Sequence, residues 1–524
     1  MTAATATAGS RVKSAFGLMF IFGFLVVMAI ATSVAIVGGN PFLFAAPAIG
    51  VGAVYAVWKM PTKYTALGLI FLMWTADYLP ESPQGGVWNS PLHPIGEFLF
   101  FNLSAVTGVA ALRIAGLDFM VFVLLGVGSL RRALRSKTDP PTTPSVRPLT
   151  YLLLMQSGAV VLFDIWGSGT GGNFNESLWQ LRQLFTLPLM AMLFLHAISG
   201  SHADIRTIGK LAIVAAVWKS LVGMYFFWMI ARPSGKIYEF TTSHSDTLLF
   251  VPLLGMQLAL FFEKPVARSW RDALKWLPIV IYGMILNDRR LAYVSLMGVF
   301  LCYMLMYPQK NKLKRGFKRF LILSSPILVM YVAAGWNSMS PVFGGAQLVK
   351  SLIKGDQAQA GADYRDIENY DVLYTWSENA IIPLGFGKKF EEPVKLPDIS
   401  FVMPTYQYHP HNTILWMWTI GGVIGFTFFF APLMVGVFLA ARVFRKATHY
   451  LDRVAAMTVI AMVIAHINQC FGDMGTRTYF GSMGCALALA VISKIAVRVG
   501  AWPGAAKPEV APAPQLVTVA PVRG

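Results

Sequence analysis

The sequence predicts an all-α, polytopic membrane protein with about 14 transmembrane helices and one large periplasmic loop. Its composition supports this fold class, because 56% of the 524 residues are hydrophobic, only 13% are charged, and the mean hydropathy is +0.57. Soluble proteins carry about 25% charged residues. Apolar runs long enough to cross a bilayer also recur from residue 15 to residue 497. Together these observations argue strongly against a soluble multidomain protein.

The apolar runs give the expected helices in order. At a core length of about 20 residues per helix, they are Ala15–Val37, Pro41–Trp58, Tyr64–Leu79, Leu117–Leu130, Leu149–Trp166, Leu181–Ser199, Ile208–Ile230, Thr247–Phe262, Leu274–Leu286, Leu291–Tyr307, Phe320–Trp336, Thr413–Ala441, Val454–Phe471 and Tyr479–Val497. The segment Pro94–Leu130 is expected to hold an interfacial helix before its single span. The first run follows Arg11 and Lys13 as in a signal peptide, but it is long and more spans follow at once. It is therefore predicted to remain in place.

The net charge of +18 raises the question of nucleic acid, but the distribution of the charges indicates a membrane. With the N-terminus in the cytoplasm, most Lys and Arg fall in cytoplasmic loops, which is the positive-inside pattern. These residues are Lys59, Lys63, Arg131, Arg132, Arg135, Lys137, Arg147, Lys264, Arg268, Arg271, Lys275, Lys310, Lys312, Lys314, Arg315, Lys318, Arg319, Arg442, Arg445, Lys446 and Arg453. The opposite short loops hold few, namely Arg182, Arg232, Lys236, Arg289, Arg290 and Arg477. No nucleic-acid partner is expected.

Four regions follow from this topology. They are an N-terminal transmembrane bundle at 1–336, a large periplasmic loop or cap at 337–411, C-terminal transmembrane helices at 412–498, and a disordered cytoplasmic tail at 499–524. The loop is mixed polar and aromatic, which favours a small ordered cap with helical pieces over a flexible connector. The cysteines Cys302, Cys470 and Cys485 show neither metal spacing nor a disulfide framework.

Several arginines lie on the periplasmic side against the topology bias: Arg182, Arg289, Arg290 and Arg365. A diphosphate would explain them, because the planar guanidinium matches phosphate oxygens and stays charged. For any one of them the alternative is an arginine that snorkels or pairs with a carboxylate at a helix end. Asp288 and Asp366 are candidate partners, and Asp164 is a candidate to orient Arg182. Lys219 lies in the middle of a span with no evident partner.

His411 is the best candidate for a general base. Neutral imidazole accepts a proton at ordinary pH, and this histidine stands where the large loop re-enters the membrane. Asn412 can cap the helix that follows. Gly422 and Gly425 would let another helix approach closely.

These residues resemble the signature of the O-antigen ligase and O-antigen polymerase superfamily. In HNTILWMWTIGGVIG, His411 and Asn412 are followed after nine residues by Gly422 and Gly425, as in that family's His-Asn and Gly-x-x-Gly pattern. NAIIPLGFGKKF, Asn379–Phe390, is similar to the segment that ends the family's large loop. Arg290 and Arg365 stand where the family has its two arginines. Arg289 replaces the family's usual Ser, which leaves both Arg289 and Arg290 open for the first role. The resemblance covers about Asn287–Phe430.

The resemblance implies a GT-C-like, inverting, metal-independent glycosyltransferase of the bacterial inner membrane, multi-pass and with both termini cytoplasmic. The donor would be a glycan on undecaprenyl diphosphate. The acceptor would be lipid A–core in a ligase, another lipid-linked repeat unit in a polymerase, or a protein hydroxyl in some relatives. It implies no cofactor and no metal, and membrane lipids surround the site. The residue chemistry agrees, because arginines can stabilise a leaving diphosphate and His411 can deprotonate an acceptor hydroxyl.

Two other classes compete with this interpretation. A lipid-linked oligosaccharide flippase also has many spans and cationic cavities, but it would place charges near the midplane and often shows two related halves. No such repeat is evident. A membrane scaffold would not require the loop residues described above.

The topology makes a direct prediction. Residues 337–410 should be periplasmic, and residues 310–319 and 442–453 cytoplasmic, because the Lys/Arg asymmetry requires it. Single cysteines in 337–410 should react with a membrane-impermeant thiol reagent in intact spheroplasts. Labelling that requires lysis would contradict both the topology and the mechanism.

Overall fold

The computed structural model describes most of the chain. It covers residues 51–76, 90–101, 115–134 and 142–502, with gaps at 53, 236–237, 239, 265–266, 309–310, 339–342, 344–345, 347–348, 351–359, 401–402, 404 and 477–478. The expected span Ala15–Val37, most of Pro41–Trp58 and nearly all of the expected tail lie outside the described residues.

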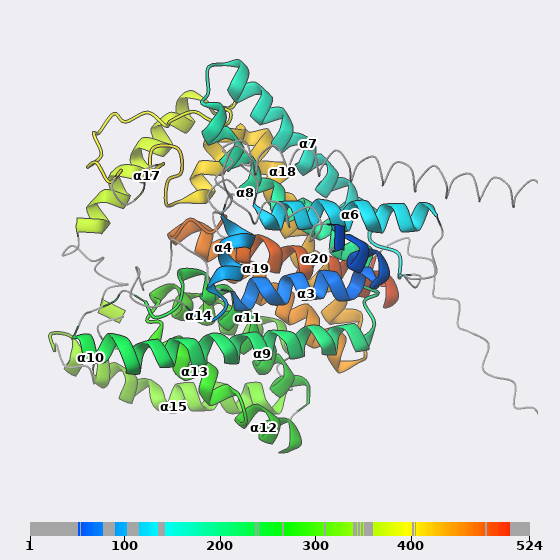
Figure 1. Ribbon diagram of the computed structural model, residues 1–524. Coiled ribbons are helices and arrows are strands. Elements are labelled where there is room, and N and C mark those ends of the chain that lie inside the picture. The colour runs from blue at the N-terminus through cyan, green and yellow to red at the C-terminus, as the bar shows by residue number, and fades with distance from the viewer. Residues whose placement is uncertain are drawn as a thin grey trace, which may run out of the picture.

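The described residues form helices and connecting segments, without a β-strand (Figure 1). The elements are α3 Thr62–Thr75, α4 His93–Phe100, α6 Gly116–Ala133, α7 Arg147–Gly169, α8 Phe174–Ala197, α9 His202–Phe226, η1 Phe227–Ala231, α10 Arg232–Ser234, η2 His244–Asp246, α11 Thr247–Glu263, α12 Ala267–Leu274, α13 Leu277–Leu286, α14 Arg290–Met306, α15 Lys312–Gly335, α17 Ala360–Glu378, α18 Thr413–Lys446, α19 Tyr450–Gly472 and α20 Tyr479–Arg498. The all-helical class is confirmed.

Eight described helical segments are long and apolar enough to cross a membrane. They contain α7, α8, α9, α11, α15, α18, α19 and α20, and each coincides with an expected span. The apolar helices α13 and α14 are shorter. α3, α4 and α6 are also helical, as expected, and the interfacial position of α4 stays a prediction. The coarser prediction of a multi-pass membrane protein therefore stands, while the total of about 14 spans stays a prediction.

The bundle has a buried centre and a lipid-facing periphery. The span of α20 is 94% buried, and α11 and α19 follow at 78% and 72%. The core cluster draws on all three, together with α3 and α8. The span of α15 is 0% buried, although it is strongly apolar. A helix whose apolar side chains face outward in this way is stable when lipid surrounds it.

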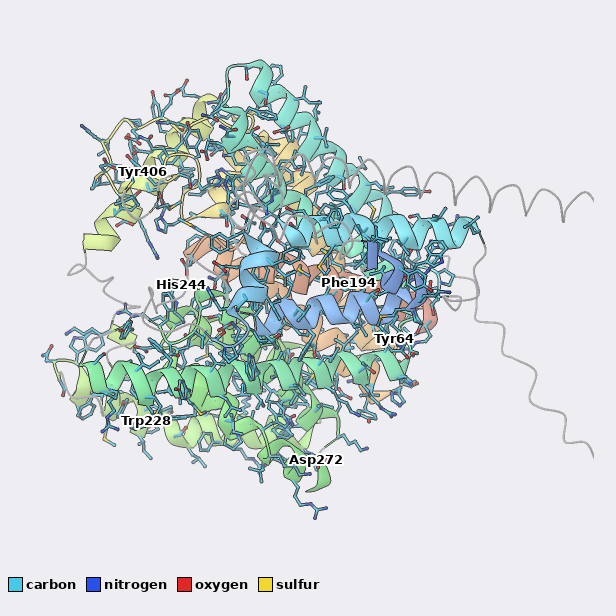
Figure 2. All side chains as sticks on the ribbon, in the orientation of Figure 1. Tyr64, Phe194, Trp228, His244, Asp272 and Tyr406 are labelled. Carbon is cyan, nitrogen blue, oxygen red and sulfur yellow. The ribbon has the colours of Figure 1, made fainter. Side chains whose placement is uncertain are left out.

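The structure brings the Lys/Arg-rich loops together at one end of the bundle. Arg453 at the start of α19 pairs with Glu263 at the end of α11, with 2.8 Å between Nε and Oε2. Lys63 in the first turn of α3 pairs with Asp204 in the first turn of α9. Figure 2 places Tyr64 and Asp272 toward this end, and His244 and Tyr406 toward the opposite end. This arrangement agrees with the expected register of spans, and the compartment at each end stays a prediction.

α17 and the segment up to His411 form a small ordered unit at the end opposite the Lys/Arg-rich loops (Figure 1). The apolar side chains of this unit pack on one another and on Met474, which comes from the α19–α20 turn. They are Tyr364, Val372, Phe390, Leu396, Met403 and Tyr406. We call residues 360–411 the cap.

α18 is broken at Gly422. The backbone there has φ +58° and ψ −166°, a region that essentially only glycine enters. A Cβ at this position would also stand 3.2 Å from the carbonyl oxygens of Ala380 and Ile381. Gly422 therefore permits both the break and the close approach of the cap.

Replacement of Gly422 by alanine should lower the thermal unfolding temperature of the purified protein. The strained backbone should cost roughly 1–3 kcal/mol. Gly158→Ala in α7 is the matched control, because nothing lies within 4 Å of the added methyl group. That change should raise helix stability by roughly 0.5–1 kcal/mol. Equal unfolding temperatures for the two variants would contradict the assigned backbone conformation.

Candidate functional site

Three segments that are far apart in the sequence meet around His411. They are α17, the His411–Asn412 turn before α18, and the turn between α19 and α20. The Met474 amide donates to the His411 carbonyl over 2.8 Å, and an Arg365 Nη1 donates to the Gly472 carbonyl over 3.0 Å. Two of the sequence-predicted residues, His411 and Arg365, thus contact the same turn.

His411 is held by a carboxylate from α17. Its Nδ1 lies 3.0 Å from Glu368 Oε2, and its backbone amide donates to the same oxygen over 2.9 Å. The Glu368 side chain is 1% exposed and that of His411 is 22% exposed. When Nδ1 donates its proton to Glu368, the lone pair of Nε2 is available as an acceptor. The imidazole is therefore oriented, fixed in one tautomer and still reachable.

Asn412 and the glycines hold the start of α18. The Asn412 Oδ1 accepts from the Leu415 amide over 3.2 Å, as an N-cap does. A Cβ on Gly425 would stand 2.6 Å from the Phe163 ring of α7. The cap segment passes between these two helices, where the Phe386 amide donates to the Phe163 carbonyl over 3.1 Å.

Basic side chains lie around the Asp473 carboxylate, close to His411. Arg289 Nη2 donates to its Oδ2 over 2.6 Å, and His244 Nδ1 lies 2.7 Å from the same atom. Burial alone would raise the pKa of Asp473, but the hydrogen bond and charge of His244 and the charges of Arg289 and Arg365 lower the pKa to about 2. Asp473 therefore stays ionised and can hold these basic side chains close together.

Arg289 and Arg290 occupy different environments. Arg289 is 14% exposed and paired with Asp473, whereas Arg290 begins α14 and is exposed. Arg365 is also exposed. The preceding Asn287 accepts from the amides of Thr241 and Thr242, which anchors the segment that carries His244. Arg290 and Arg365 are thus the arginines that a ligand from outside can reach.

Arg182 lies in a separate buried pair. Its Nε is 2.7 Å from Asp118 Oδ2, and its side chain is 9% exposed. Nη2 also donates to the Tyr479 hydroxyl over 2.5 Å. The partner is therefore Asp118 of α6, and the expected partner, Asp164 of α7, is wrong. Which of the two neighbouring helices supplies the carboxylate is decided by packing. The predicted part of Arg182 in diphosphate binding has less support than that of Arg290 and Arg365.

Glu368, Asp473 and His244 were missed in the sequence. The available signal for Glu368 was its position three residues after Arg365 on one helix. Asp473 and His244 lie far from the motif, and only the packing brings them to it. Lys219, without an evident partner in the sequence, lies 3.6 Å from Asp246, and the two side chains are 1% and 0% exposed. This buried pair does not offer the accessible midplane charge that a transporter would need.

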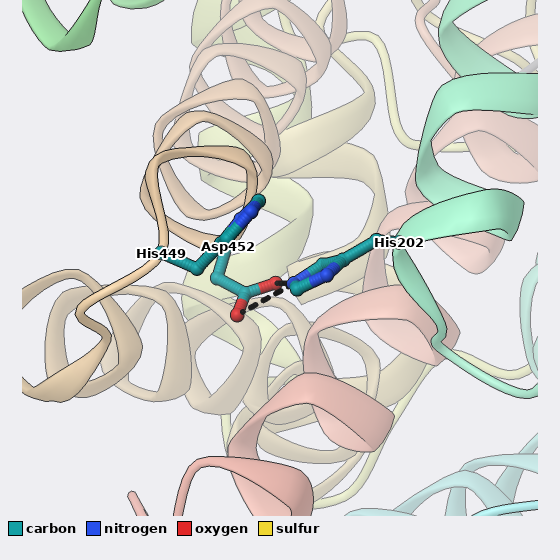
Figure 3. Close-up of side chains that lie close together, drawn as sticks. All are labelled: His202, His449 and Asp452. Atoms are coloured by element: carbon teal, nitrogen blue, oxygen red, sulfur yellow. Dashed lines mark hydrogen bonds and ion pairs between the residues drawn. The ribbon is translucent and has the colours of Figure 1, made fainter.

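A second group of polar side chains lies at the Lys/Arg-rich end. His202, His449 and Asp452 are the three side chains that come close enough together in the described residues to suggest a metal site (Figure 3). The imidazoles are stacked with 3.8 Å between ring centroids, so their lone pairs, which lie in the ring planes, do not converge. His449 Nδ1 accepts from the Leu451 amide over 3.2 Å. Burial and the charge of His202 lower the pKa of His449, which favours the neutral ring that accepts this hydrogen bond.

Comparison with known families supports the assignment suggested by the motif. Residues 277–430 match the family model described as O-antigen ligase. The match contains α14, α15, α17 and the first half of α18, and with them Arg290, Arg365 and His411. It supports the O-antigen ligase and polymerase superfamily. A family of this kind acts on lipid-linked glycans in general. No curated protein matches the chain.

Loss of the Asp473 charge should destabilise the site. In Asp473→Asn, Arg289 and His244 keep their positions in a poorly solvated environment without a compensating carboxylate. We expect a loss of roughly 3 kcal/mol, the lower end for a broken buried ion pair, seen as a lower thermal unfolding temperature. The control is Asp272→Asn, whose pair with Lys275 is largely exposed and should matter little. Equal effects of the two changes would contradict the role of Asp473.

Proposed function

We propose that the protein is an inverting, metal-independent glycosyltransferase that moves or polymerises a glycan carried on undecaprenyl diphosphate at the periplasmic face of the bacterial inner membrane. The acceptor is lipid A–core or a lipid-linked repeat unit. The observation that carries the proposal is the oriented His411 at the turn that Arg365 contacts and where Arg289 pairs with Asp473. The family match at residues 277–430 supports the substrate class in general terms.

His411 acts as the general base in this proposal. Its Nε2 accepts the proton of the acceptor hydroxyl, and that oxygen attacks the anomeric carbon of the donor sugar. The bond from this carbon to the diphosphate oxygen breaks as the new bond forms, so the anomeric configuration is inverted. Glu368 is a positioning residue, because it fixes the imidazole tautomer and stabilises the imidazolium that results.

The arginines stabilise the leaving group. The charge that develops on the departing diphosphate falls within reach of cationic side chains, which is the role a metal plays in other glycosyl transfers. Arg290 and Arg365 are exposed, and each presents a planar fork to phosphate oxygens. Arg289 contributes mainly through Asp473. The proton of the acceptor hydroxyl therefore goes to His411, while the arginines stabilise the leaving diphosphate. The reaction needs no carboxylate pair of the kind that glycosidases use.

Replacement of His411 by alanine should abolish transfer and leave donor binding and expression largely intact. A general base is typically worth 10²–10⁴-fold, so the loss is measurable with purified protein and lipid-linked donor. His409→Ala is the control. His409 is 5% exposed and its ring packs 5.6 Å from that of Trp416, so this change affects packing and should reduce turnover much less. Transfer should survive EDTA. Wild-type turnover of EDTA-treated His411→Ala protein would place the base elsewhere.

The variant Glu368→Gln tests whether Glu368 acts by positioning His411. This variant should lower turnover in the wild-type background and have no further effect in the His411→Ala background, since Glu368 acts through the imidazole. A purely structural Glu368 would reduce residual turnover equally in both backgrounds.

A further inference from the structure

The cap segment from Ala380 to Gly387 runs along the transmembrane helices. The Leu384 and Gly385 amides donate to the carbonyls of Thr419 and Ile420 in α18, over 3.2 and 3.1 Å. At the break in α18, the Val423 amide donates to the Ala380 carbonyl over 3.2 Å. The chain is not helical here, and the neighbouring helices supply the partners of its backbone. Non-helical backbone at membrane depth is tolerated only with such partners.

The outward side chains of this segment are apolar. Ile381 is 82% exposed and Ile382 is 64% exposed. They adjoin Val423 and Ile424 of α18, which are 53% and 62% exposed, because Val423 bonds to Ala380. We call these four residues the isoleucine patch. Two of them belong to a candidate membrane span, so the patch continues the lipid-facing surface of α18 onto the cap.

The depth of the patch follows from the length of α18. The part of this helix after Gly422 is long enough by itself, at about 1.5 Å per residue, to cross a hydrocarbon core about 30 Å thick. Gly422 therefore lies near the boundary between hydrocarbon and headgroups. Trp166 marks the same level, because its ring is 43% exposed while its Nε1 donates to the Pro383 carbonyl over 2.9 Å. Tryptophan is enriched at this boundary.

We propose that Ile381 and Ile382 insert into the hydrocarbon of the leaflet on the α17 side and anchor the cap to the bilayer surface. The apolar exposure, the satisfied backbone and the continuity with α18 all favour lipid as the occupant of the patch. The first nine residues of α18, about 14 Å of helix, then separate His411 from the hydrocarbon boundary. On the proposed function, this holds the base at the level of a lipid-borne diphosphate.

Fluorescence quenching tests the insertion without any need for activity. Ile381→Cys and Ile382→Cys are labelled with an environment-sensitive fluorophore in nanodiscs of phosphatidylethanolamine and phosphatidylglycerol. Val394→Cys is the matched control, an apolar cap residue that is 44% exposed and outside the patch. The protein without an introduced cysteine gives the background, since Cys470 and Cys485 are buried and Cys302 is partly buried.

We expect the labels at 381 and 382 to be quenched several-fold more by nitroxide on the lipid acyl chain than by iodide in the water, and the label at 394 to show the reverse. Efficient iodide quenching at 381 and 382 would overturn the proposal. Quenching by neither agent would also overturn it, because a protein surface would then cover the patch. Neither result depends on glycan transfer, so failure of the anchor and failure of the proposed function are distinguishable.

Discussion

The arrangement of the site depends on the polar contacts that the Asp473 carboxylate makes. It holds Arg289 from the α13–α14 turn and His244 from the segment before α11, and it lies within the field of Arg365 from the cap. Its neighbour Met474 bonds to the His411 carbonyl. The guanidinium groups of Arg289 and Arg365 carry like charges, which would otherwise repel each other. The ionised carboxylate of Asp473 offsets this repulsion and stabilises the cluster.

The second constraint is the lipid environment. Buried backbone groups must find partners within the protein, which limits how a non-helical cap can approach the bundle. Here the cap can approach closely because α18 is broken at Gly422 and the neighbouring helix carries small residues. Gly167 of α7 allows the backbone of Phe386 to lie directly against it, since a Cβ there would stand 2.0 Å from the Phe386 carbonyl oxygen. The cap is thereby joined to α7 and α18 beside the break at Gly422.

The two parts of the candidate site have different physical origins. His411 is oriented by its hydrogen bond to Glu368, whose side chain is 1% exposed. The arginines owe their proximity to the packing of α14 and α17 around the α19–α20 turn. His411 and Arg289 are therefore held by two different carboxylates, Glu368 and Asp473.

Hydropathy and charge along the chain determined the all-helical membrane fold, the positions of the eight long spans and the grouping of basic loops at one end, because these properties depend on local sequence and on the bilayer. The motif was sufficient to single out the candidates His411, Asn412, Gly422, Gly425, Arg290 and Arg365. Only the tertiary structure decided that Glu368 holds His411, that Asp473 and His244 join Arg289, and that Arg182 pairs with Asp118. Each of these contacts joins residues on different segments, and the local sequence does not specify how those segments pack against one another. Side-chain pairs of this kind are set by packing, and packing is a property of the whole fold.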